Sequence, residues 1–109
     1  MKEMTLNKLI KNMEINPLRY IGEYDIEKLS IFITAFLYGK DVSQTMTTRE
    51  KIFREKFSFW VRDYYNAPEI SVGWADILYF YEGLHKPAIE TFFELYKQWY
   101  QEEFGEDAW

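Results

Sequence analysis

Residues 87–104 read PAIETFFELYKQWYQEEF, and this stretch decides the fold class. Its apolar side chains recur at the spacing that gathers them on one face of an α-helix. That face consists of Ile89, Phe92, Phe93, Tyr96, Trp99 and Tyr100. Pro87 is typical of the first residue of a helix, and Gly105 is suited to end one in a left-handed conformation. The stretch therefore predicts a long amphipathic helix whose aromatic face packs against other helices.

A second long helix is predicted from residue 47 to about Tyr65. Thr47 and Glu50 have the spacing of a capping box, in which each side chain bonds to the backbone N–H of the other residue. The sequence Asn66-Ala67-Pro68 is expected to end the helix. Its apolar stripe consists of Phe53, Phe57, Trp60, Val61 and Tyr64.

Two helices are predicted upstream of it. The first covers residues 5–13 and stops before Asn16-Pro17, because proline forces the preceding residue out of the helical region. Its buried face is expected to consist of Leu6, Leu9, Ile10 and Met13. Residues 16–24, which include Gly22, are expected to form a loop.

The next helix is expected to begin at Asp25, a favourable cap, and to end at Gly39. Residues 40–46 are then predicted to be a polar surface loop. The apolar residues of this helix wrap most of its circumference, which is typical of a central, buried helix. They are Ile26, Leu29, Ile31, Phe32, Ile33, Phe36 and Leu37.

One more helix is predicted between Ser71, a plausible cap, and Gly83. Its apolar face consists of Trp74, Ile77, Leu78 and Tyr81. No stretch alternates apolar and polar residues over more than a few positions, and no repeat occurs. The sequence therefore predicts an all-α, single compact domain of about five helices over residues 1–109, with a short acidic C-terminal tail at about residues 105–109.

The composition excludes several classes of protein. The 109 residues include 13 Lys and Arg against 18 Asp and Glu, for a net charge of −5, and 20% are aromatic. A chain this apolar builds a core, so disorder is excluded, and the lack of cysteine excludes disulfides and thiolate chemistry. The negative balance disfavours nucleic acid. No apolar run is long enough for a membrane span or a secretory signal, so a cytoplasmic protein is expected.

Catalytic patterns are sparse. The single histidine, His85, lies between Gly83 and Pro87 and is expected to be a solvated loop residue. Glu82 and His85 match the Glu-x-x-His pattern of di-metal bundles, but such sites need a second copy and two further glutamates. We therefore expect no catalytic residue, no metal and no cofactor.

Charge is distributed unevenly along the chain. Residues 40–62 hold six basic residues against three acidic ones, whereas from Glu90 onward six acids accompany Lys97 alone. The acidic segment is either a solvated helix with a frayed tail or a surface that steers a basic partner. Tyrosines off the helical stripes are candidate anchors. The candidate partner-binding residues are Tyr24, Tyr38, Glu90, Glu94, Glu102 and Glu103.

Five short blocks of glycine, aromatic and aliphatic residues follow one another within residues 4–100. They are Pro17, Tyr20, Ile21 and Gly22; Leu29, Phe32, Phe36 and Gly39; Phe57, Trp60 and Val61; Ser71, Gly73, Trp74, Ile77 and Leu78; and Ala88, Phe92, Phe93, Glu94 and Leu95. In this pattern the chain resembles a family of small bacterial proteins encoded beside polymorphic or contact-dependent toxins and regarded as immunity proteins. It departs from the family at Leu18-Arg19, where Arg-Pro-Gly-Met is commoner.

The resemblance implies a protein that blocks a toxin by binding it tightly. The shared motifs are mainly structural and contact residues vary among relatives, so no binding residue is carried over. We expect a cytoplasmic immunity protein, not an enzyme, that occludes the basic active-site groove of a toxin such as a nuclease. The alternative is a phage-derived or regulatory adaptor. In both cases the expected partner is a protein and not a nucleic acid or a membrane. Exposed aromatic residues also allow a homodimer.

Overall fold

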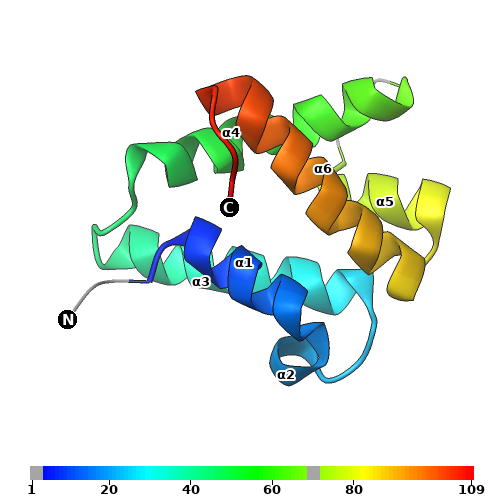
Figure 1. Cartoon of the computed structure of the whole chain (residues 1–109), viewed down its shortest axis with the longest axis horizontal. Helices are drawn as coiled ribbons and strands as arrows, with labels where there is room; N and C mark the ends of the chain where they lie inside the picture. The colour runs from blue at the N-terminus through cyan, green and yellow to red at the C-terminus, as the bar shows by residue number, and fades with distance from the viewer. Residues whose placement is uncertain (1–3, 69–71) are drawn as a thin grey trace.

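The computed structural model describes residues 4–68 and 72–109, and its regular elements in these ranges are all α-helices. The helices are α1 (Leu6–Ile15), α2 (Pro17–Ile21), α3 (Ile26–Val42), α4 (Thr48–Tyr65), α5 (Trp74–Glu82) and α6 (Lys86–Phe104) (Figure 1). The all-α prediction is confirmed. The expectation of about five helices matches the five longer ones, to which the structure adds the five-residue α2.

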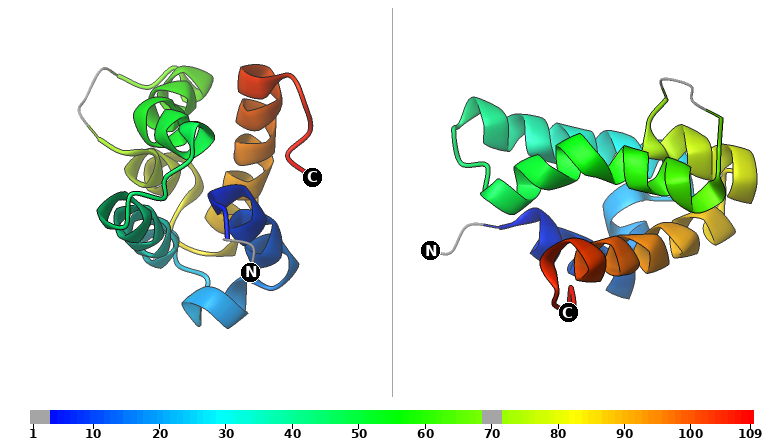
Figure 2. Two further views of the ribbon diagram at one scale, coloured as in Figure 1. Left: turned by 90° about the vertical axis from the view of Figure 1, so that its left-hand side faces the viewer. Right: turned by 90° about the horizontal axis from the view of Figure 1, so that it is seen from above.

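The helices form two layers. Helices α1 and α6 lie in one layer and α3 and α4 in the other, with α5 beside them at one end of the molecule (Figures 1 and 2). The radius of gyration of the Cα atoms is 13.4 Å. A compact domain of this length has a value of about 13 Å, so the layers form one globule.

The central helix is α6, whose buried residues fill the space between the layers. They are Ala88, Ile89, Phe92, Phe93, Leu95, Tyr96, Trp99 and Tyr100. The prediction that residues 25–39 form the central helix is wrong. Ile31 of α3 is 68% exposed, and Phe32 and Phe36 are half-buried. Only one face of α3 meets the core because the helix lies at the edge of its layer, so its other apolar residues remain at the surface.

The predicted caps of two helices are confirmed. Thr47 Oγ1 accepts a hydrogen bond from Glu50 N, and Glu50 Oε1 accepts one from Thr47 N at 2.8 Å, which completes the capping box of α4. Asp25 accepts from the first backbone N–H groups of α3. Asn66 ends α4 with a φ of 51°. Gly105 ends α6 in the left-handed region, as its position predicted.

Two boundaries differ from the prediction. Residues 17–21 of the expected loop form α2, because Pro17 at its first turn already has a helical φ and Gly22 closes it at a φ of 76°. Helix α3 continues through Gly39 to Val42, so the expected loop begins only at Ser43. The predicted cap Ser71 lies outside the described residues.

The C-terminal tail folds back onto α1, so the frayed-tail interpretation is wrong. Asn7 Nδ2 donates to the carbonyl oxygen of Ala108 at 2.8 Å, and Trp109 Nε1 donates to Glu14 at 3.2 Å. The ring of Trp109 stacks 5.9 Å from that of Tyr96. An indole ring buries a large apolar area, which explains why an acidic segment remains attached.

Candidate functional site

The two side chains of the single Glu-x-x-His pattern, Glu82 and His85, bind different partners. Glu82 accepts a hydrogen bond from the hydroxyl of Tyr65 at 2.8 Å, while His85 Nδ1 lies 3.2 Å from the carbonyl oxygen of Tyr24. His85 is exposed and precedes the first turn of α6. Over residues 4–68 and 72–109, no three His, Asp or Glu side chains gather in a metal-binding arrangement. Glu82 and His85 therefore do not face a common substrate or ion.

The six predicted partner-binding residues lie in three separate places. Tyr24, Glu90 and Glu94 border a depression between the end of α1 and the first half of α6. The ammonium of Lys86 lies 5.4 Å from the ring centroid of Tyr24. Glu94 pairs with Lys97 at 3.3 Å, so two of these three residues already have cationic neighbours within the chain.

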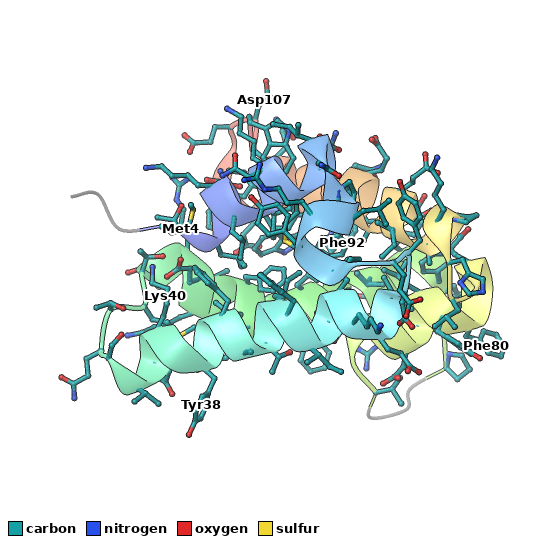
Figure 3. All side chains as sticks on the ribbon, turned by 90° about the horizontal axis from the view of Figure 1, so that it is seen from below. Met4, Tyr38, Lys40, Phe80, Phe92 and Asp107 are labelled. Carbon is teal, nitrogen blue, oxygen red and sulfur yellow. The ribbon has the colours of Figure 1, made fainter. Side chains whose placement is uncertain are left out.

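Tyr38 lies on the outer face of α3 and is 70% exposed. It borders a groove between α3 and the helices α4 and α5, which also includes Ile31, Arg54 and Asp76. Figure 3 shows Tyr38 pointing outward from α3, with Phe80 at another edge of the molecule. Tyr38 is therefore not near the acidic residues with which the sequence analysis grouped it.

Glu102 and Glu103 face α4. Trp60 Nε1 donates to Glu102 at 2.9 Å, and Lys56 Nζ lies 3.2 Å from Glu103. The acids of α6 thus meet the basic α4 within the chain, which accounts for part of the uneven charge distribution. The structure does not unite the six predicted residues in one acidic surface.

A different surface, which the sequence analysis missed, joins the last turns of α4 and α5. We call it the aromatic row; it comprises Trp60, Tyr64, Tyr65, Tyr81 and Phe80. Consecutive ring centroids are separated by 5.7, 5.0, 4.5 and 4.9 Å in that order. Tyr64 is 53% exposed, Tyr81 40% and Phe80 77%. The row is therefore a continuous series of ring contacts that is open to solvent.

The row is exposed because of how α6 crosses α4. The two helices cross and then diverge toward the C-terminal end of α4 (Figure 1). Tyr64 shares a helical face with the buried Phe57 and Val61 but lies past the crossing, so nothing covers it fully. The sequence did carry a local signal, since Tyr79, Phe80 and Tyr81 are consecutive in a helix and cannot all point to one side.

Two carboxylates contact the row. Glu102 binds the indole N–H of Trp60, and Glu82 binds the hydroxyl of Tyr65. Burial, reinforced by the hydrogen bond to Glu82, raises the pKa of the Tyr65 phenol. Tyr65 therefore stays protonated at neutral pH and donates to Glu82, which fixes both the ring and the carboxylate. The site combines aromatic faces with oriented negative charge.

No family model matches the chain, and no curated protein or solved structure matches it either. Across the described residues, no helix has the length and hydropathy needed to cross a bilayer. What the structure defines is an all-α domain with two exposed surfaces rich in apolar side chains, the aromatic row and the outer face of α3.

Proposed function

We propose that this chain is a non-enzymatic cytoplasmic immunity protein that binds a cognate bacterial toxin domain and neutralises it. The observation that carries the proposal is the exposed aromatic row. Within the described residues, every buried side-chain nitrogen and oxygen has a hydrogen-bond partner, whereas Tyr64, Tyr81 and Phe80 of the row remain exposed. Tyrosine and tryptophan are favoured anchors of protein interfaces, and such residues are costly to leave exposed without a function.

Inhibition would occur by occlusion of the toxin's active site. The net charge of −5 would speed the encounter with a basic surface, such as the substrate groove of a nuclease. The row would then supply the close contact. This division of roles differs from the sequence-based expectation, in which the acids of α6 form the contact surface together with Tyr24 and Tyr38.

The family resemblance also supports the proposal. Its motif residues Phe57, Trp74 and Phe92 are all buried, and their rings contact one another with centroids 4.7 to 5.9 Å apart. These residues therefore maintain the scaffold rather than the contact surface. A scaffold with a variable exterior is suited to a family in which each member recognises its own toxin.

The test is co-expression and direct binding with the toxin domain encoded by the neighbouring gene. Wild-type chain should restore growth of cells that express the domain, and calorimetry should give a dissociation constant of about 1 nM or tighter. An unchanged toxicity together with no heat of binding would contradict the proposal.

A second candidate is an adaptor that joins two partners. It is favoured by the presence of two separate exposed surfaces, because the outer face of α3 carries Ile31 and Tyr38 far from Phe80 in the row. An adaptor would form a ternary complex in analytical ultracentrifugation, with one partner lost on mutation of each surface. An immunity protein would form a binary complex, and mutation of a single surface would abolish it.

A further inference from the structure

Two carboxylates, those of Glu102 and Glu82, adjoin the aromatic row. Glu102 and Glu82 each bind an aromatic N–H or O–H group, from Trp60 and Tyr65 respectively. Among the described residues, neither carboxylate is within 4.0 Å of a Lys or Arg nitrogen, and no cation lies over a ring of the row. The row is thus a set of aromatic faces next to two negative charges.

In two other clusters, aromatic faces and a carboxylate are both in contact with a cationic side chain of the chain itself. The guanidinium of Arg49 lies 4.5 Å from the ring centroid of Phe104 and 5.6 Å from that of Tyr100. The same guanidinium pairs with the carboxylate of Glu106. One arginine therefore makes cation–π contacts with two aromatic rings and an ion pair with a carboxylate.

A lysine completes a second cluster of this kind. The ammonium of Lys97 lies 5.7 Å from the ring centroid of Trp109 and pairs with Glu14 at 2.8 Å. The hydrogen bond that Lys97 donates to the carboxylate of Glu14 raises the pKa of Lys97, so the cation is held charged. Compared with these two clusters, the aromatic row has the rings and the acids but no cation from the part of the chain that the structure describes.

We propose that the aromatic row, together with Glu102 and Glu82, is the docking surface for an arginine-bearing segment of the protein partner. A guanidinium is planar and weakly hydrated, stacks on aromatic faces and donates to carboxylates at the same time. The inference deepens the proposed function and rests on it, because the partner would be the toxin.

A second copy of the chain is a less suitable occupant. Docking two rows against each other would bring the carboxylates of both copies together, and each copy carries a net charge of −5. Juxtaposed like charges oppose association. An arginine of a different protein would instead place a positive charge opposite these carboxylates.

The experiment is a titration of the full ¹⁵N-labelled chain at low salt with a short peptide of alternating arginine and serine. The four tryptophan indole N–H signals are the readout, and W60F assigns the signal of Trp60. The Trp60 signal should move saturably, while the signal of Trp109 on the opposite face of α6 stays in place. A peptide with glutamate in place of arginine should move neither.

Matched double variants separate docking at the row from general attraction to an acidic protein. In Y64A/F80A, which removes two rings of the row, the dissociation constant should rise about fivefold to tenfold. In I31A/Y38A, which removes equally exposed side chains from α3, it should change by less than about twofold. Urea unfolding of both variants checks that they remain folded.

Three results would overturn the inference. They are a Trp60 signal that does not move, an equal loss of affinity in both double variants, and a dimer in sedimentation that F80A dissociates, which would assign the row to a second copy. Because the titration contains no toxin, a negative result would contradict this inference but not the proposed function, which the toxicity test decides separately. Failure of the toxicity test alone would show that the row receives a basic partner of another kind.

Discussion

The two halves of α4 differ in what surrounds them. In the N-terminal half, Glu50 is 3% exposed and accepts hydrogen bonds from Leu6 N at 2.7 Å and from Lys40 Nζ at 3.1 Å. This half is therefore tied to α1 and α3 through one carboxylate. In the C-terminal half, Trp60, Tyr64 and Tyr65 are open to solvent to different degrees.

The difference shows how one helix can serve both stability and recognition. Every donor around Glu50 has its acceptor inside the molecule, including Lys40, which also donates to the carbonyl oxygen of Met4 at 3.1 Å. In the aromatic row, Trp60 and Tyr65 pack against the core, whereas Tyr64, Tyr81 and Phe80 are exposed and can be changed at little cost to folding. Substitution of Glu50 should thus reduce stability, and substitution of the exposed rings of the row should reduce binding.

The largest effect is expected where the two halves meet, at Phe57. Its fully buried ring contacts rings from α4, α5 and α6, including that of Trp99 at 5.5 Å. F57A should lower the free energy of unfolding by about 4–5 kcal/mol because it leaves a cavity. F59A removes a ring that lies two residues away and is 58% exposed. This variant should change the free energy of unfolding by less than about 0.5 kcal/mol. Equal urea midpoints for the two variants would contradict this.

The next largest effect is expected at the buried ion pair. E50A leaves the ammonium of Lys40 without its carboxylate and should cost about 3 kcal/mol of unfolding free energy. K40M should cost less, because Glu50 would keep its hydrogen bonds from Leu6 and Thr47. Y64A, in the other half of α4, should cost under about 1 kcal/mol. Chemical denaturation of all three variants tests the ranking, and a loss in Y64A as large as in E50A would remove the distinction between the halves.

A smaller effect is expected from the C-terminal tail. W109A removes the stacking on Tyr96 and the hydrogen bond to Glu14, and should lower the free energy of unfolding by about 1–2 kcal/mol. N7A deletes the bond to Ala108 and also removes the acceptor of the buried Tyr96 hydroxyl, so it should cost about 2 kcal/mol. Wild-type stability in W109A would show that the tail does not contribute to the fold.

The smallest effect is expected from acid titration of Glu50. Burial alone raises the pKa of this carboxyl, but the N–H groups of Thr47 and Leu6 and the Lys40 ammonium outweigh burial and hold the pKa below its ordinary value of 4.5. The stability that this group contributes is therefore present above pH 4.5 and is lost as the pH falls through the lower folded-state value. Urea unfolding between pH 7 and 3 should show a shallower decline in E50Q than in the wild type. Parallel curves would contradict the prediction.

Local signals in the sequence predicted most helix boundaries and few of the contacts. The capping box of Thr47 and Glu50 was readable because both residues lie within one turn. Lys40 was assigned to a polar loop and is buried, since its acceptor Glu50 lies on another helix. Tyr64 and Tyr81 were assigned to buried stripes and are exposed, because a stripe shows which residues share a face but not where the covering helix stops.

For the site, the sequence supplied residue types but not their grouping. Tyr24, Tyr38 and Glu102 were placed in one candidate set, whereas the structure separates them over three surfaces. Glu102 alone adjoins the aromatic row. The rings of Tyr65 and Tyr81 are in contact at 4.5 Å but belong to different helices. Such contacts produce no periodic pattern in the sequence and could not be predicted from it.

The sequence by itself determined that this protein is an all-α domain with a large aromatic core, because helical periodicity and capping depend on residues within a turn or two of one another. The tertiary structure alone decided which helix is central, that Lys40 is buried and that the aromatic row is open. Those properties depend on where α6 crosses α4 and on how far each helix extends past the crossing. Packing between distant segments sets that geometry, and no stretch of the chain encodes it locally.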